Sequence, residues 1–141
     1  MRDLELALKA AADPTRTRIL KLLEAGPLCV CQIQAVLGLA PSTVSKHLAT
    51  LKVAGLAEDR RDGRWIHYAL TEAGRNPYAA GVLALLKGTP DKDPAILADR
   101  RRLREVRAIP IDALCGVLPL PRPEPPRRRL QRSKPGEHRN A

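Results

Sequence analysis

The chain of 141 residues lacks phenylalanine altogether and contains one tryptophan and two tyrosines. A core without aromatic rings has to be built from leucine, isoleucine, valine and alanine, which favours helices packed through aliphatic side chains over an aromatic-filled sandwich. The chain also lacks a run of about 18 uninterrupted apolar residues, the length that a membrane-spanning helix needs. No signal peptide precedes the first expected helix. We therefore expect a small cytoplasmic protein without a membrane partner.

Acidic residues are in the minority, with 15 Asp and Glu against 25 Lys and Arg and a formal net charge of +10. Such a charge attracts polyanions at long range and is screened by salt, so nucleic acid is the first candidate partner. About half of the excess lies in residues 119–141, a stretch rich in Pro and Arg with little apolar bulk. We expect this stretch to be a disordered tail.

Cysteine is also scarce, and the three cysteines cannot all pair within one chain. In a reducing compartment they are better explained as thiols or metal ligands than as structural disulfides. Cys29 and Cys31 stand at the predicted start of a helix, where side chains two positions apart do not face each other. Both thiolates can therefore hold one ion only if the helix start unwinds or bends. Cys115 is a further candidate ligand, from the same subunit or another; the alternative for each cysteine is a small buried side chain.

Apolar spacing predicts helices over residues 3–12, 14–25, 29–37 and 41–54. Gly38 ends the third of these, and only about three residues separate it from the fourth. Two short helices joined by so brief a turn predict a helix-turn-helix. The outward positions of its second helix are all hydrogen-bond formers without an acidic residue, which predicts DNA contact by Ser42, Thr43, Ser45, Lys46, His47 and Thr50. For His47, metal ligation is the alternative.

A hairpin is predicted directly after the helix-turn-helix. Residues 56–60 and 65–70 have the pattern of strands, and Asp62-Gly63 is a two-residue turn signal between them. Three arginines, Arg60, Arg61 and Arg64, lie at the tip. In this position the hairpin is a wing, whose arginines would lie near phosphates or in a minor groove. The expected fold is mainly α with a small β-hairpin wing, a winged helix-turn-helix.

The C-terminal part is predicted to contain helices over residues 76–87 and 93–108, followed by a brief turn at 111–116 that holds Cys115. The apolar stripe of the second of these helices is thin, with Ile96, Leu103 and Val106 as its main members. A helix so narrowly apolar is expected to cover one neighbour at most.

Four stretches together resemble the ArsR/SmtB family of metal-responsive winged-helix repressors: ADPTRTRILKLL at 12–23, LCVC at 28–31, LAPSTVSKHLATLKVAGL at 39–56 and RRDGRWIHYAL at 60–70. The similarity covers about residues 3–88. The LCVC stretch resembles the arsenic-sensing branch, in which such cysteines bind trivalent arsenic or antimony and the repressor leaves its operator. The resemblance implies a homodimer paired through helices 3–12 and 76–87. Its two reading helices would enter successive major-groove half-sites of a palindromic operator in double-stranded DNA.

The resemblance also implies a ligand set. The arsenic-sensing pattern has a third cysteine three positions after the second, where this chain has Gln34. Because trivalent arsenic is soft and thiophilic, the implied site consists of Cys29, Cys31 and Cys115, with As(III) or Sb(III) as inducer and no organic cofactor. The zinc-sensing branch is disfavoured because residues 76–88 contain no Asp, His or Glu.

The predicted function is a transcriptional repressor released from DNA by arsenite or antimonite. The alternatives are a sensor of another soft metal ion, a thiol redox switch on the same fold, or a non-sensing architectural DNA-binding protein. A thiol enzyme is disfavoured because no His or Lys base lies near Cys29 and Cys31 in the sequence. We divide the chain into a DNA-binding and dimerisation domain (1–88), a C-terminal helical extension (89–118) and a Pro/Arg-rich tail (119–141).

Overall fold

The computed structural model describes residues 1–72 and 74–116, and the tail predicted for residues 119–141 lies outside these ranges. The elements are α1 (Arg2–Ala12), α2 (Pro14–Leu23), β1 (Leu28–Cys29), α3 (Val30–Leu37), α4 (Pro41–Val53), β2 (Ala57–Asp62), β3 (Trp65–Leu70), α5 (Ala79–Leu86), α6 (Pro94–Arg107) and α7 (Ile111–Gly116). This architecture confirms the predicted mainly helical fold with a β-hairpin. None of the helices within these ranges is long and apolar enough to cross a membrane.

Local signals in the sequence account for the start of α2, the end of α3 and the start of α4. The Asp13 side chain accepts a hydrogen bond of 3.0 Å from the Arg16 backbone N–H, and Pro14 is the first residue of α2. Gly38 ends α3 in the left-handed conformation (φ 65°), which glycine adopts without the steric cost of a Cβ atom. Pro41 begins α4 only three residues later. The resulting sharp turn holds α3 against α4 as a helix-turn-helix.

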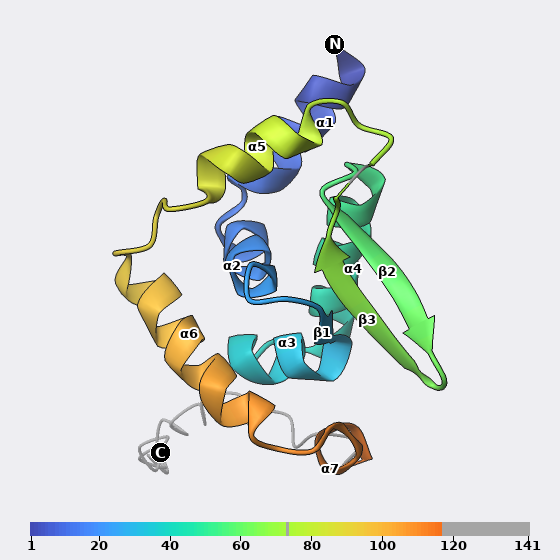
Figure 1. Cartoon of the computed structure of the whole chain (residues 1–141), viewed down its shortest axis with the longest axis vertical. Helices are drawn as coiled ribbons and strands as arrows, with labels where there is room; N and C mark the ends of the chain where they lie inside the picture. Colours follow the sequence, from blue (N-terminus) through green and yellow to red (C-terminus); the bar gives the residue numbers. More distant parts are fainter. Residues whose placement is uncertain (73, 117–141) are drawn as a thin grey trace, which may run out of the picture.

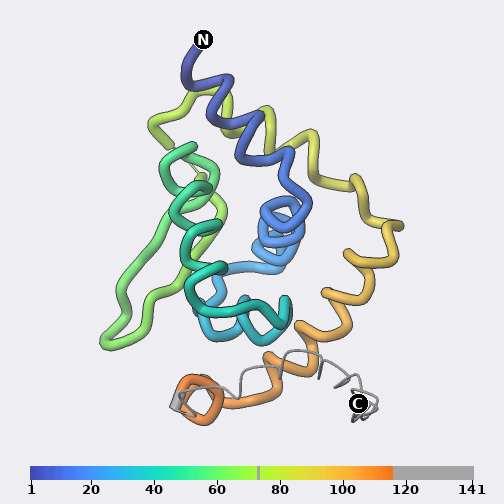
Figure 2. The backbone as a smooth tube through the Cα atoms, turned by 180° about the vertical axis from the view of Figure 1, so that it is seen from behind, coloured from blue at the N-terminus to red at the C-terminus, as the bar shows by residue number. Residues whose placement is uncertain are grey.

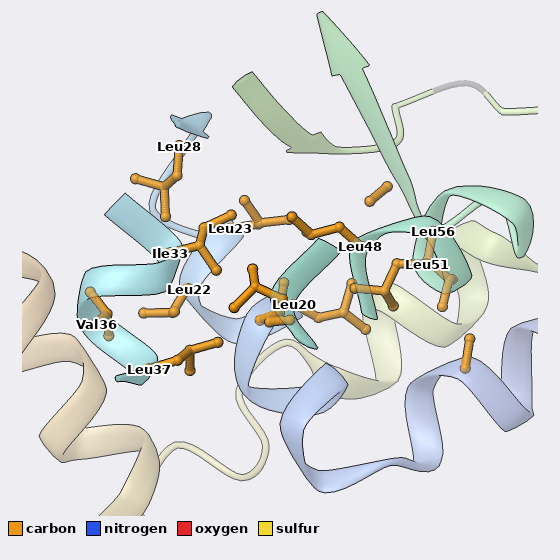
Figure 3. Close-up of a cluster of buried hydrophobic side chains, with 14 of the residues drawn as sticks. Leu20, Leu22, Leu23, Leu28, Ile33, Val36, Leu37, Leu48, Leu51 and Leu56 are labelled. Atoms are coloured by element: carbon orange, nitrogen blue, oxygen red, sulfur yellow. The ribbon is translucent and has the colours of Figure 1, made fainter. Parts of the chain in front are cut away.

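The core lies between α2, α3 and α4 and is aliphatic, as the composition predicts. Leu20 and Leu22 of α2, Ile33 of α3, and Leu48 and Leu51 of α4 are each at most 1% exposed. Figure 3 shows these side chains pointing toward one another from the three helices. Apolar burial of this kind is the main term that stabilises the fold, and it fixes the position of α4 on α2 and α3.

The sheet has three antiparallel strands in the order β1-β3-β2. The β2–β3 hairpin is the predicted wing, and its register places Asp62 opposite Trp65 at the tip. The sequence did not predict β1, because two residues are too few to show an alternating pattern. It pairs with the other edge of β3, Leu28 opposite Tyr68 and Cys29 opposite His67. This pairing holds Cys29 in extended backbone.

Helix α5 begins at Ala79, whereas the sequence predicts a start at Asn76. The Asn76 side chain is buried and donates hydrogen bonds of 2.8 Å to the carbonyls of Asp3 and Ala54, while its oxygen accepts from the Tyr78 N–H. These bonds fix the residues before the helix in a non-helical turn. They also join the start of α5 to α1 and to the end of α4.

The elements gather at two ends of the molecule (Figure 1). Helices α1 and α5 pack together at one end, and α6 and α7 pack against α3 at the other. The view from behind in Figure 2 shows α4 between the wing and α2. The prediction that the helix over 93–108 covers one neighbour is wrong, since α6 packs on both α2 and α3. Arginine side chains add polar contacts to its thin apolar stripe.

A buried lysine connects α2 to the segment before α6. Lys21 is 3% exposed; its ammonium lies 2.8 Å from carboxylate oxygens of both Glu24 and Asp91 and donates to the Leu86 carbonyl at 2.7 Å. Hydrogen bonds from Lys21 and then Arg100 hold the pKa of Asp91 below its usual value. At pH values above the pKa of an unfolded aspartate, the network therefore contributes its full stabilisation to the fold. This stabilisation is lost as the pH falls through the lowered pKa of Asp91.

We expect Asp13→Ala to lower the free energy of unfolding by about 1 kcal/mol, because α2 loses its N-cap. Urea denaturation followed by circular dichroism measures the change. Glu5→Ala serves as the control, since it also removes an acidic side chain but only from an exposed pair with Lys9 on α1. Equal stability of the Asp13 variant and the wild type would contradict the capping role.

Candidate functional site

The three cysteines, which lie far apart in the sequence, meet in the structure. The Sγ atoms of Cys29, Cys31 and Cys115 all lie within 4.8 Å of one another. Cys29 comes from β1, Cys31 from the first turn of α3, and Cys115 from α7 of the same chain. Within residues 1–72 and 74–116, no other group of three or more His, Cys, Asp or Glu side chains is close enough to share an ion. The structure thus brings together all three predicted ligands.

Cys29 and Cys31 converge without any unwinding of a helix. Cys29 is the N-cap of α3, in extended conformation (φ −67°, ψ 148°), and the helix itself begins at Val30. The Cys29 N–H donates to Oε1 of Gln32 at 2.9 Å, which completes the helix start. The expectation that both thiolates can share an ion only if the helix bends is therefore wrong, because pairing with β3 already places Cys29 outside the helix.

Two of the three sulfurs are covalently joined. Cys31 and Cys115 form a disulfide, with Cα atoms 5.7 Å apart, where the sequence predicts thiols. This spacing suits a disulfide, so the bond is the oxidised form of a pair that the fold already brings together. Cys29 is a free, buried thiol whose Sγ lies 3.7 Å from that of Cys115. Since thiolates and not disulfides bind soft metals, the reduced chain is the form able to hold an ion.

The segment that carries Cys115 is the helix α7 and not the predicted turn. Six residues after Pro110 are too few for a clear helical period, so sequence alone does not distinguish the two. Leu114 and Cys115 are buried, and α7 packs against α3. Tertiary packing therefore holds this short helix in place.

The predicted DNA-reading side chains of α4 lie on the surface, with one exception. Ser42, Thr43, Ser45, Lys46 and Thr50 are exposed. His47 is half-buried, and its Nδ1 lies 3.3 Å from a guanidinium nitrogen of Arg16 and 3.9 Å from the Asp13 carboxylate. The ring of His47 is thus fixed to the start of α2, and it does not belong to the cysteine cluster.

The wing arginines Arg60, Arg61 and Arg64 are exposed as predicted. Arg64 lies over the ring of Trp65, 4.9 Å from its centroid, and its guanidinium is 3.7 Å from the Asp112 carboxylate of α7. This second contact could not be predicted from the sequence, because the wing and α7 are far apart along the chain. It means that the segment carrying Cys115 also reaches the wing.

Known proteins resemble this chain in sequence and in fold. The sequence pattern of a family described as "Bacterial regulatory protein, arsR family" matches residues 13–59. Over 103 residues the chain is 38% identical to the arsenic resistance transcriptional regulator ArsR1 of Pseudomonas putida, an alignment that covers 72% of this chain and 77% of that protein. The chain belongs to the ArsR family.

Two further relatives agree with this membership. The ArsR-family chain is 45% identical over 64 residues to the arsenical resistance operon repressor of Escherichia coli, covering 45% of this chain and 55% of that protein. It also resembles the solution structure of the homodimeric winged helix-turn-helix DNA-binding domain of Mb0332 from Mycobacterium bovis, a possible ArsR-family regulator. That likeness has a TM-score of 0.55 and 31% identity, and covers 64% of this chain and 81% of that one. The predicted winged helix-turn-helix is confirmed, and the chain is a transcriptional regulator from a family that is not enzymatic.

Proposed function

We propose that this ArsR-family regulator is a homodimeric repressor that binds a palindromic operator and leaves it when trivalent arsenic or antimony binds Cys29, Cys31 and Cys115. The observation that carries the proposal is the convergence of three sulfur atoms within 4.8 Å at the start of α3, the first helix of the helix-turn-helix. A ligand held there acts directly on the element that positions the reading helix.

The chemistry of the donor set favours a soft ion. In the reduced chain three thiols can condense with arsenite, so that each thiol loses its proton, three sulfur–arsenic bonds form and three waters leave. A three-sulfur donor set without carboxylate or imidazole is one that thiophilic ions prefer. The arsenic-resistance names of the relatives support As(III) or Sb(III) as the inducer.

Two connections lead from the thiol site to the DNA-binding surface. The turn at Gly38 joins α3 to α4, and the contact between Asp112 and Arg64 joins α7 to the wing. We expect that drawing the three sulfurs onto one atom moves α3, which positions α4, and α7, whose ion pair with the wing is exposed. Inducer and DNA would then favour different arrangements of one chain, which is the requirement for coupled binding.

The proposed dimer uses α1 and α5, which lie together at one end of the molecule (Figure 1). Both helices expose apolar side chains there: Leu8 is 48% exposed, and Leu85 is 69% exposed. The homodimeric relative supports this assembly. A twofold dimer presents two α4 helices to successive half-sites of the operator. The proposed location of the protein is the cytoplasm. In this proposal residues 1–88 bind DNA and dimerise, and residues 89–118 supply the third ligand.

The test measures DNA affinity with and without arsenite. A duplex is first selected by the full chain from a random library, and its binding is then followed by fluorescence anisotropy in a phosphine reductant, which keeps the cysteines reduced without adding competing thiols. We expect arsenite to weaken binding about 5- to 150-fold, the usual range of coupling between two sites. Unchanged affinity would overturn the sensor and leave an architectural DNA-binding protein.

The disulfide between Cys31 and Cys115 favours one other candidate function, a thiol redox switch. Here two thiols lose two electrons and two protons to an oxidant, and the disulfide changes the position of α7. Two arms of the assay separate the candidates. Release by a thiol oxidant in buffer without reductant, together with indifference of the reduced chain to arsenite, identifies the switch, whereas release by arsenite in the reduced chain identifies the metalloid sensor.

A further inference from the structure

The position of Cys115 depends on how α6 is attached to the rest of the molecule. Cys115 follows α6 after a short connection. Its sulfur lies beside those of Cys29 and Cys31, which come much earlier in the sequence. The apolar contribution of α6 comes from few side chains, with Ile96, Leu103 and Val106 buried. Aliphatic contacts alone are non-directional, so they do not define where along α2 and α3 the helix sits.

A fourth member of the buried stripe is an acid. Asp99 is on the same face of α6 as Ile96 and Leu103, and its side chain is only 7% exposed. Its two carboxylate oxygens accept hydrogen bonds from Arg18 of α2, at 2.7 Å from Nε and 2.8 Å from Nη2. This paired geometry is directional and specific to one position of the two helices. A carboxylate in a buried stripe would be strongly disfavoured without such a partner.

Other polar contacts of α6 are more exposed. Arg102 donates to the Ala35 carbonyl of α3 at 3.0 Å, and Arg107 donates to the Ala25 carbonyl at 3.1 Å. Both are exposed arginines bound to a single backbone oxygen. The hydrogen bond with Asp99 raises the pKa of the Arg18 guanidinium above its usual value. The Arg18–Asp99 pair is therefore the most defined link between α6 and the helices beneath it.

We propose that Arg18 and Asp99 are positioning residues of the thiol site: by fixing α6 on α2 they place the Cys115 sulfur beside those of Cys29 and Cys31. Neither residue touches the bound ion. The inference deepens the proposed function and rests on it for the identity of the ligand, but the placement of Cys115 can be measured without arsenic. Its hydrogen bonds join α2 to α6 and reach none of the cysteines. The pair acts through α6, and its effect on the site is comparable to that of outer-shell partners, which orient metal ligands.

The first experiment measures how readily Cys31 and Cys115 pair in the full chain. In the Cys29→Ser background, glutathione disulfide is titrated, so that two protein thiols become one disulfide as one glutathione disulfide becomes two glutathiones. We expect Asp99→Asn to lower the effective concentration of the two thiols about 10- to 100-fold, the usual effect of losing an outer-shell partner. Arg101→Gln, which removes a charge from the exposed face of α6, is the control and should leave it unchanged.

The second experiment measures arsenite binding to the reduced chain by ultraviolet absorbance and counts sulfurs around arsenic by X-ray absorption. Asp99→Asn should weaken binding about 10- to 100-fold and reduce the count from three to two. In a Cys115→Ser background the same substitution should have no further effect, because the residue it positions is gone.

An unchanged glutathione equilibrium in Asp99→Asn would overturn the inference. So would an equal loss of arsenite affinity in the presence and absence of Cys115, since that pattern indicates general destabilisation of the fold. If Asp99→Asn impairs the pairing of Cys31 with Cys115 but the wild type does not bind arsenite, the positioning role stands and the proposed inducer is wrong.

Discussion

Cys31→Ser is expected to give a repressor that binds its selected duplex with wild-type affinity and stays bound at arsenite concentrations that release the wild type. The hydroxyl is a hard oxygen donor that a thiophilic ion does not favour. We expect the affinity for arsenite to fall at least about 100-fold, more than the loss of an outer-shell partner causes. Anisotropy titrations of the duplex at several arsenite concentrations measure both quantities.

Cys29→Ser should behave in the same way and is the sharper test, because its structural effect is small. Serine is a favoured N-cap residue, and the Cys29 N–H keeps its bond to Gln32. Val30→Ala, which alters the half-buried neighbour of both cysteines without touching a sulfur, is the matched control and should still be released. Release of either serine variant at wild-type arsenite concentrations would remove that cysteine from the site.

Loss of the three wing arginines is expected to weaken DNA binding and flatten its dependence on salt. In the triple variant Arg60→Gln, Arg61→Gln, Arg64→Gln, the slope of log affinity against log salt should become shallower by up to about 2.7 if each arginine contacts a phosphate. Because phosphate contacts carry no sequence information, affinity should fall about equally for all duplexes. Anisotropy between low and physiological salt measures the slope.

The control for the wing removes the same number of charges elsewhere. Lys87→Gln, Arg101→Gln, Arg104→Gln changes the net charge equally but at exposed positions of α6 and just after α5. This variant should show a small change in slope, since exposed charges more than about 10 Å from the DNA are largely screened. Equal slopes for the two triple variants would mean that net charge, and not contact by the wing, accounts for the effect.

The winged helix-turn-helix could be predicted from the sequence because local signals mark where its helices and its hairpin begin, turn or end. Gly38 and Gly63 occupy left-handed positions where the chain turns, and Pro41 begins the reading helix. The parts that were missed lack such signals. β1 is a two-residue strand that pairs with one edge of β3, and α7 packs on α3. Neither carries a pattern long enough to be seen in the sequence.

The thiol site could be predicted only in part, for a related reason. Residue types and spacing identified the three cysteines, but no local pattern shows that Cys115 lies beside Cys29, since that proximity depends on how α6 packs. One signal was present in the sequence: Asp99 falls on the stripe of apolar positions of α6, where a carboxylate needs a cationic partner. Its partner Arg18 could not be identified, because several arginines were equally available.

The three sulfur atoms belong to one chain. The proposed inducer binding therefore needs one subunit, whereas the proposed operator binding needs two. A monomer already contains every proposed ligand, so the proposed inducer affinity does not depend on how much protein a cell makes. The proposed operator binding needs the α4 helices of two subunits, so it would strengthen with protein concentration as monomers associate. At low protein concentration the chain would still bind inducer, although it would occupy little of the operator.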